Sequence, residues 1–271
     1  MAEENIKELA RKIVAQALAF GADLAGVVRV DDLKRSPSHR LGERLPDFDY
    51  RGAERAKDRK SGTVEWPQDA RSAIVIAVAH PPDKPELDWL IVDDSTRNTP
   101  GNLRSMKVIS RLAAWLENQH GLRCFKLSYH IIHGGIYMKD VAVLAGLGCI
   151  GKNNVLITPQ YGPHQRLRVM LTDADLPTTG AIDFDACIDC PMPCRDACPQ
   201  GAFTEKIYTE KEYGFDQLPG RNGVYSRLRC NRQMEIDNVT CETIQIAGQA
   251  KPGGLVRYCR ECELACPAGS R

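Results

Sequence analysis

The chain has 271 residues, of which 43% are hydrophobic and 26% charged, enough to bury one large core and a smaller second one. This composition excludes a wholly disordered protein. Lysine and arginine total 36 against 35 for aspartate and glutamate, so net charge gives no reason to expect binding to nucleic acid or to an anionic membrane surface.

The N-terminal residues lack the apolar stretch of a signal peptide, and no run of about 18 apolar residues occurs. We therefore expect a cytoplasmic protein without membrane association. The chain has eleven cysteines, of which only Cys124 and Cys149 precede residue 180. In a reducing compartment, such clustering indicates metal or redox chemistry rather than disulfides.

The first part of the chain alternates helical and strand patterns. Apolar residues between Glu4 and Phe20 recur at helical spacing, and a strand fits Leu24 to Val30. The charged, proline-containing stretch from Lys34 to Gln68 predicts a long surface excursion that covers a site. The continuous apolar run Ala73 to Ala79 is typical of a strand buried on both faces.

Further elements continue this alternation up to a domain boundary. A second helix is indicated by Leu103, Met106, Ile109, Leu112 and Leu116. A strand near Cys124 to Leu127, a third helix leading into Ala145, and strands at 155–158 and 167–172 follow. We predict an α/β (α+β) domain over residues 1–182 and a separate domain over 183–271, with the break at the turn of residues 177–180.

Two cysteine motifs lie in the second domain. Residues 187–199 read Cys-Ile-Asp-Cys-Pro-Met-Pro-Cys-Arg-Asp-Ala-Cys-Pro, one residue longer in the middle gap than the bacterial ferredoxin run. Residues 259–267 repeat the C-x2-C-x3-C-P ending. This spacing suits [4Fe–4S] clusters, because a short loop supplies three thiolates and the cysteine before proline reaches the other cluster.

We therefore predict two [4Fe–4S] clusters that share ligands between the motifs. The first is assigned to Cys187, Cys190, Cys194 and Cys266, and the second to Cys198, Cys259, Cys262 and one thiolate from the connecting segment. Spacing leaves Cys230 and Cys241 open for that position. A pair of zinc sites is the alternative, but zinc does not explain two C-x3-C-P endings.

A glycine-rich segment precedes the cysteine motifs. Residues 145–162 read Ala-Gly-Leu-Gly-Cys-Ile-Gly-Lys-Asn-Asn-Val-Leu-Ile-Thr-Pro-Gln-Tyr-Gly. Together with the cysteines, this segment resembles the epoxyqueuosine reductases and, more distantly, the reductive dehalogenases. The resemblance covers most of the chain. Arg229-Cys230-Asn231 resembles the isolated cluster cysteine of that family, which favours Cys230 over Cys241.

The resemblance implies a nitroreductase-like sheet domain that binds cobalamin or another corrinoid, followed by a ferredoxin-like domain. Electrons from a low-potential donor such as ferredoxin or flavodoxin would pass through the clusters to cobalt, for reduction of a small organic substrate or a partner corrinoid protein. Gly148 and Gly151 would let the backbone approach the corrinoid, while Lys152 and Asn153 would donate hydrogen bonds to it. The alternative for this segment is a tight helix-to-strand connection.

The chain departs from the family at the proton donor. Epoxyqueuosine reductases resemble one another in an aspartate shortly before the glycine-rich segment, where this chain has Ile-Ile-His-Gly-Gly at residues 131–135. His133 and Tyr137 are the nearest replacement acids, since dehalogenase-like enzymes resemble one another in using a tyrosine. Either residue can instead be purely structural. The missing aspartate and the small net charge speak against a nucleic-acid partner, so reduction of epoxyqueuosine in tRNA ranks last.

A different class of function also fits the cysteines. The chain could be a ferredoxin-like electron-transfer protein without its own catalytic site, with the front domain as a docking surface. The size of that domain favours an enzyme, because an electron carrier needs little more than the last third of the chain. Bound corrinoid in the purified protein would discriminate between the two.

Overall fold

The computed structural model describes residues 3–42, 44–45, 62–94, 97–246, 248 and 251–269. The described helices are α1 (Glu3–Ala19), α2 (Val30–Lys34), α3 (Pro37–Gly42), α4 (Pro100–His120), α5 (Met138–Leu144), α6 (Pro193–Asp196), α7 (Glu210–Tyr213), α8 (Arg227–Val239) and α9 (Glu261–Leu264), with 3-10 turns η1 (Pro85–Asp88) and η2 (Ile131–His133). None of them combines the length and the apolar character needed to cross a membrane.

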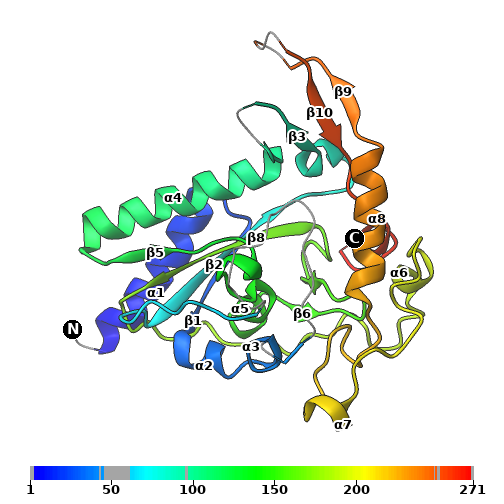
Figure 1. The fold of residues 1–271 in the computed structure, drawn as a ribbon. Helices are drawn as coiled ribbons and strands as arrows, with labels where there is room; N and C mark the ends of the chain where they lie inside the picture. Colours follow the sequence, from blue (N-terminus) through cyan, green and yellow to red (C-terminus); the bar gives the residue numbers. More distant parts are fainter. Residues whose placement is uncertain are drawn as a thin grey trace.

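The central sheet is antiparallel and has the strand order β1-β2-β8-β5 (Figure 1). Its strands are β1 (Leu24–Arg29), β2 (Ser72–Ala79), β5 (Cys124–Lys126) and β8 (Gln165–Thr172). Seven of the eight residues of β2 are buried, as expected from its continuous apolar run. The mixed α/β architecture predicted from the sequence is confirmed at this level.

Helices cover the two faces of this sheet and form a core on each (Figure 1). On one face, Ile13 of α1 and Leu112 of α4 pack against Ile74 of β2. On the other, Val141 of α5 packs against the alternate strand positions. The helix predicted from Leu103 to Leu116 is present as α4, although Leu103 and Met106 are 49% and 41% exposed. The buried stripe begins at Ser105 and Val108 instead.

A second antiparallel sheet pairs strands from residues 90–98 with strands from residues 242–256 and has the strand order β4-β3-β10-β9. Its strands are β3 (Leu90–Val92), β4 (Arg97–Asn98), β9 (Glu242–Ile244) and β10 (Gly253–Val256). The pairing of Leu255 with Ile91 places β10 directly beside β3, although the two strands are more than 160 residues apart in the sequence. Residues 183–271 are therefore tied to the front of the chain by strand pairing as well as by side-chain packing.

The surface excursion predicted for residues 34–68 is wrong for the part that the structure describes. Residues 37–42 form α3, and Leu41 is almost completely buried with Tyr208, Tyr213 and Leu218. The sequence did not indicate this contact, because the residues around Leu41 are charged and its apolar partners lie more than 160 residues away. Residues 43 and 46–61 of the same stretch lie outside the described residues.

Candidate functional site

The first thiol group consists of Cys187, Cys190, Cys194 and Cys266. The thiols of Cys187 and Cys266 are buried and share an apolar cluster with Ile157. Burial and the three neighbouring thiols together raise the pKa of Cys194 to about 11. The structure thus brings into one electrostatic neighbourhood the four cysteines that the sequence assigned to the first cluster, although Cys266 comes from the far end of the chain.

Several bonds hold the loop that carries this group. The Asp185 carboxylate accepts the backbone N–H of Cys187 at 2.8 Å and forms a bidentate pair with Arg221 at 2.7 and 2.6 Å. The backbone N–H groups of Lys152 and Met192 donate to the sulfur atoms of Cys187 and Cys190, each at 3.4 Å. Amide donors to sulfur are among the means by which proteins tune cluster potentials.

The second thiol group consists of Cys198, Cys230, Cys259 and Cys262. Cys230 lies in the first turn of α8. Its side chain packs with those of Cys198 and Cys262 against an aromatic cluster. Burial raises the pKa of Cys262, and the nearby thiols of the other three members raise it further. The backbone N–H of Ala202 donates to the Cys198 sulfur at 3.3 Å.

Cys241, the other candidate for the fourth ligand, lies elsewhere. It is exposed after the end of α8, and its thiol lies 3.8 Å from the backbone oxygen of Glu242 and close to Gly254 of β10. Its neighbours are therefore the strands of the second sheet. This placement supports Cys230 as the member of the second thiol group.

The exposure of the eight cysteines differs between the two groups. Three members of the first group are buried and Cys190 is half-buried, whereas in the second group Cys259 is exposed and the other three are half-buried. Within the part of the chain that the structure describes, no group of three His, Cys, Asp or Glu side chains is arranged to hold one metal ion. In a [4Fe–4S] cluster each thiolate binds a different iron at a corner of the cube. That the two groups hold such clusters stays a prediction.

The glycine-rich segment connects α5 to the β6–β7 hairpin (Cys149–Ile150 and Leu156–Ile157). A Cβ atom at Gly148 would lie 2.0 Å from the backbone oxygen of Ile157, and one at Gly151 would lie 2.5 Å from the Ile157 side chain. The absence of a Cβ atom at Gly148 and Gly151 therefore lets the backbone pack closely against Ile157 of the same chain. This matches the tight connection that was the alternative interpretation of the segment.

Lys152 and Asn153 face the cysteine-bearing loops. The buried Asn153 side chain donates to the Cys262 backbone oxygen at 3.1 Å. The Lys152 backbone oxygen accepts two bonds from the Arg195 guanidinium, at 3.0 and 3.1 Å. Contacts within the chain therefore explain why Gly148, Gly151 and Asn153 occupy their positions. The Lys152 side chain is the remaining group of the four that could bind a ligand. The role of this segment in holding a corrinoid stays a prediction.

Tyr137 caps the N-terminus of α5 and lies against α3. Its ring meets the His39 ring edge-on, with centroids 5.0 Å apart, and its backbone N–H donates to His39 Nε2 at 3.2 Å. His39 Nδ1 therefore carries the proton and donates to Ser36 Oγ at 2.8 Å. Ser36 in turn donates to the buried Asp140 carboxylate at 2.7 Å.

This network was not foreseen from the sequence. Asp140 also accepts from the backbone N–H and hydroxyl of Ser38, at 2.8 and 2.6 Å. Burial lowers the pKa of His39 to about 4, so the imidazole is neutral at physiological pH. Ser36, Ser38 and His39 are polar residues in a charged stretch, where no periodic pattern distinguishes them. Their role becomes visible only through the contact with Asp140, about 100 residues away in the sequence.

His133, the other predicted acid, ends η2 and is half-buried. Its ring centroid lies 6.0 Å from that of His130. Burial, together with the charges of His133, Arg168 and Arg227, lowers the pKa of His130. The Arg168 guanidinium also stacks on the Tyr129 ring at 4.3 Å. His133 thus lies in a cationic and aromatic environment.

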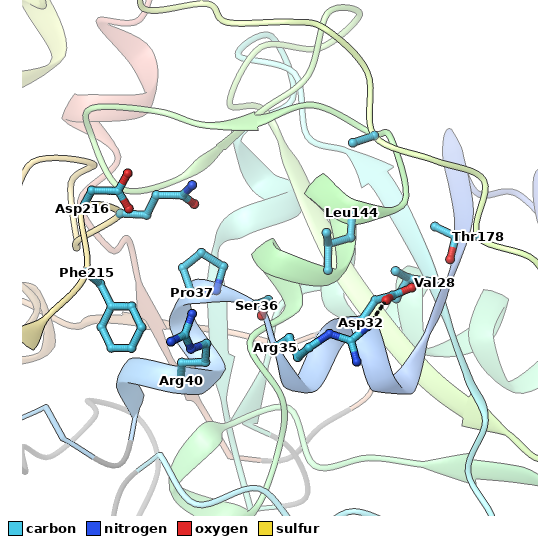
Figure 2. A pocket seen from close by; sticks show the side chains of 12 residues that line it. Val28, Asp32, Arg35, Ser36, Pro37, Arg40, Leu144, Thr178, Phe215 and Asp216 are labelled. Carbon is cyan, nitrogen blue, oxygen red and sulfur yellow. Dashed lines mark hydrogen bonds and ion pairs between the residues drawn. The ribbon is translucent and has the colours of Figure 1, made fainter.

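A cavity of about 580 Å³ lies between the α2–α3 region and the loop after α7 (Figure 2). Its size falls within the range of small-molecule sites. Arg40 stacks on Phe215 at 4.2 Å on one side, while Val28 and Leu144 contribute apolar surface on another. The Ser36 side chain reaches it as well. Neither thiol group lines this cavity.

Comparisons with known proteins agree with the resemblance seen in the motifs. No family model matches the chain. An epoxyqueuosine reductase from Gloeobacter violaceus is 26% identical over 97% of this chain and 76% of its own length. A tetrachloroethene reductive dehalogenase from Desulfitobacterium hafniense is 37% identical over 34% of this chain and 20% of its own. The resemblance to these two kinds of protein is therefore confirmed.

The structure agrees at the level of the fold. An epoxyqueuosine reductase solved with an epoxyqueuosine-modified tRNA stem loop superposes with a TM-score of 0.56 at 20% identity, over 98% of this chain and 66% of that one. The chain therefore spans about two thirds of the length of that protein. The likeness extends across both thiol groups and the central sheet.

Proposed function

We propose that the chain is an iron–sulfur reductase in which two [4Fe–4S] clusters deliver electrons to a bound corrinoid. One observation carries this proposal: eight cysteines from three distant segments gather as two groups of four, each with a backbone N–H donor to sulfur. The sequence relationship to reductases points to the same class. Within this proposal, residues 183–271 form a ferredoxin-like unit and residues 1–182 a nitroreductase-like corrinoid and substrate domain.

The chain's own residues would hold, insulate and orient the clusters. The Asp185–Arg221 pair fixes the loop of the first group, and Asn153 fixes the Cys262 segment of the second. The apolar and aromatic shell around both groups restricts water, which influences cluster potentials. The connection between β6 and β7 touches both groups, so electrons passing between them would remain in the protein interior.

A corrinoid would supply a low-valent metal that reduces substrate. Of the four residues predicted to hold it, Gly148, Gly151 and Asn153 are engaged in contacts within the chain, so the Lys152 side chain would be the group that binds it. Tyr137 or His133 would donate the proton that substrate reduction consumes. The cavity beside Arg40 and Phe215, which residues of both parts of the chain line, is large enough for a small molecule.

The substrate proposed first is a small organic molecule or a partner corrinoid protein, with ferredoxin or flavodoxin as donor. Reduction of epoxyqueuosine in tRNA is a second candidate, favoured by the function of the matched relatives and by the tRNA stem loop bound to one of them. The sequence-based expectation of no nucleic-acid partner gains no support from these relatives. The residues at 131–135 still lack the aspartate on which that reaction rests in the family.

The deciding experiment is metal analysis of protein purified without oxygen and offered cobalamin. We expect about eight irons per chain, an iron–sulfur absorption spectrum and stoichiometric cobalt. Eight irons without cobalt would leave an electron-transfer protein, which is the competing function. Zinc in place of iron would overturn the proposal.

A second assay separates the substrates. The reconstituted protein, with a low-potential reductant, is offered an epoxyqueuosine-containing tRNA stem loop, and the nucleosides are analysed by mass spectrometry. Formation of queuosine that is abolished in Tyr137→Phe or His133→Gln would assign the tRNA substrate and the acid together. Unchanged epoxyqueuosine in the presence of both cofactors would favour a small-molecule substrate.

A further inference from the structure

A buried charge network links the front of the chain to the second thiol group. At its centre is the Asp88 carboxylate, which accepts from His80 Nδ1 at 2.7 Å and from Arg166 Nε at 2.9 Å and is paired with Arg260. Glu263 closes the network by accepting from Arg166 at 3.1 Å and from Arg260 at 2.9 Å. Two carboxylates therefore balance two guanidinium groups.

The network is well shielded from water. His80 is fully buried, and the side chain of Asp88 is only 10% exposed. Burial alone would raise the pKa of Asp88, but the hydrogen bond from His80 and the charges of Arg166 and Arg260 lower it below its ordinary value. Arg260 also donates to the His80 backbone oxygen at 3.1 Å. Removing one member would leave an uncompensated charge inside the protein.

Its position points to the second thiol group. Arg260 lies between Cys259 and Cys262 in the sequence, and Glu263 follows Cys262 directly. Glu263 lies in α9 beside Cys262 and Arg260 directly precedes that helix, so both charges are held next to the Cys262 thiol by their bonds to Arg166 and Asp88. Asp88 and Arg166 come from η1 and β8 of the front domain. The network thus fixes the Cys259–Cys262 segment against the central sheet.

The structure also shows that the first thiol group has separate charged partners. Its loop is held by Asp185 and Arg221, with Arg195 beside Cys194. No ion pair among the described residues connects these side chains to Asp88 or Arg260. A change of charge in the network should therefore act chiefly on one of the two thiol groups.

We propose that Asp88, Arg166, Arg260 and Glu263 are positioning residues that set the reduction potential of the cluster held by the second thiol group. The inference rests on the proposed function, because it requires that group to hold a cluster. Reduction adds negative charge to a cluster, and a buried positive charge nearby favours the reduced state. The network is neutral as a whole, so each single substitution changes the local charge by one unit.

The test is a redox titration of the anaerobically reconstituted protein, followed by electron paramagnetic resonance. Asp88→Asn and Glu263→Gln should each raise the midpoint potential of one cluster, and Arg166→Gln should lower that of the same cluster. The other cluster serves as the internal reference. Asp94→Asn is the control, because Asp94 pairs with Lys251 on the surface, where both side chains are 79% exposed, and it should shift neither cluster.

Opposite shifts for acid and arginine variants distinguish tuning from a merely structural role. Shifts of the same sign, equal shifts of both clusters, or unchanged potentials would each overturn the proposal. Glu263→Gln removes a charge without shortening the side chain, so it provides the acid arm if Asp88→Asn does not fold. Wild-type protein that takes up no iron would instead refute the proposed function, before any variant is compared.

Discussion

The side-chain amide of Asn153 donates a hydrogen bond to the backbone oxygen of Cys262, 3.1 Å away. The two residues are 109 positions apart, yet this bond joins the glycine-rich segment of residues 145–162 to a member of the second thiol group. Because Asn153 is buried, the Cys262 carbonyl has little access to water. The glycine-rich segment therefore helps to hold the cysteine-bearing loop in place.

Asn153→Ala should destabilise the protein and weaken the second thiol group. The lost donor leaves a buried carbonyl unsatisfied, which costs about 1–3 kcal/mol. Thermal unfolding of the reconstituted protein measures the effect. Asn118→Ala, at an exposed position of α4, is the matched control and should change stability by less than about 0.5 kcal/mol. Equal effects of the two substitutions would contradict this role of Asn153.

Cys230→Ser and Cys241→Ser should differ sharply in iron content. Cys230 lies with the second thiol group, whereas Cys241 is exposed beside β10. We expect the Cys230→Ser protein to retain about four irons and the Cys241→Ser protein about eight, as determined by colorimetric iron analysis after reconstitution. The reverse pattern would exchange the assignment of the two cysteines.

The sequence predicted features that depend on local pattern. The run Ala73–Ala79 identified β2, since a strand buried on both faces shows uninterrupted apolar residues. The apolar residues from Leu103 to Leu116 identified α4, since they recur at helical spacing. The cysteine spacing also assigned the thiols to two groups, because the cysteine before proline in each motif is expected to reach the other group, and this assignment stays a prediction.

Features that depend on distant partners escaped prediction. Leu41 is buried only because Tyr208 and Tyr213 cover it, and nothing in the charged residues around it indicates such partners. The pairing of β3 with β10 brings together two short segments that have no strong strand pattern. The His80 ring hydrogen-bonds to Asp88 inside a charge network that also includes the distant Arg260. Single-sequence patterns do not encode these contacts.

Gly148→Ala should destabilise the protein even without any cofactor. The added Cβ would lie 2.0 Å from the Ile157 backbone oxygen, and overpacking of this kind typically costs about 1–3 kcal/mol. Gly121→Ala serves as the comparison, because its φ of 64° is unfavourable but no atom lies within 4 Å of the new Cβ. Chemical denaturation of the cofactor-free proteins should rank Gly148→Ala as the more damaging. A stable Gly148→Ala protein that merely fails to bind cobalamin would return the glycine to a ligand-binding role.

Acidification should destabilise the protein through His39. Its pKa is lowered to about 4 in the folded state by burial, against an ordinary value of 6.5. The unfolded chain therefore binds the proton more readily between these two pH values, and stability is lost as pH falls through that window. The linkage amounts to roughly 2 kcal/mol at pH 5 relative to pH 7.

His39→Gln removes this titration while keeping an acceptor for the Tyr137 N–H. Urea unfolding at pH 7 and pH 5 should show a smaller loss of stability in the variant than in the wild type. His120→Gln changes an exposed histidine at the end of α4 and should leave the wild-type pH dependence intact. Parallel pH dependences of His39→Gln and the wild type would exclude His39 as the source.

Asp185→Ala should weaken the first thiol group selectively. The substitution removes the acceptor of the Cys187 N–H and both bonds from Arg221, so the loop that carries Cys187 loses its anchor and the guanidinium loses its partner. Iron release to a chelator should become faster for about half of the bound iron, with the other half unaffected. Asp183→Ala, two residues away at an exposed position, should release iron at the wild-type rate. Asn153→Ala is expected to loosen the other half of the iron. The two variants together would then show that each thiol group has its own support. Uniform loss of all iron in both variants would contradict that separation.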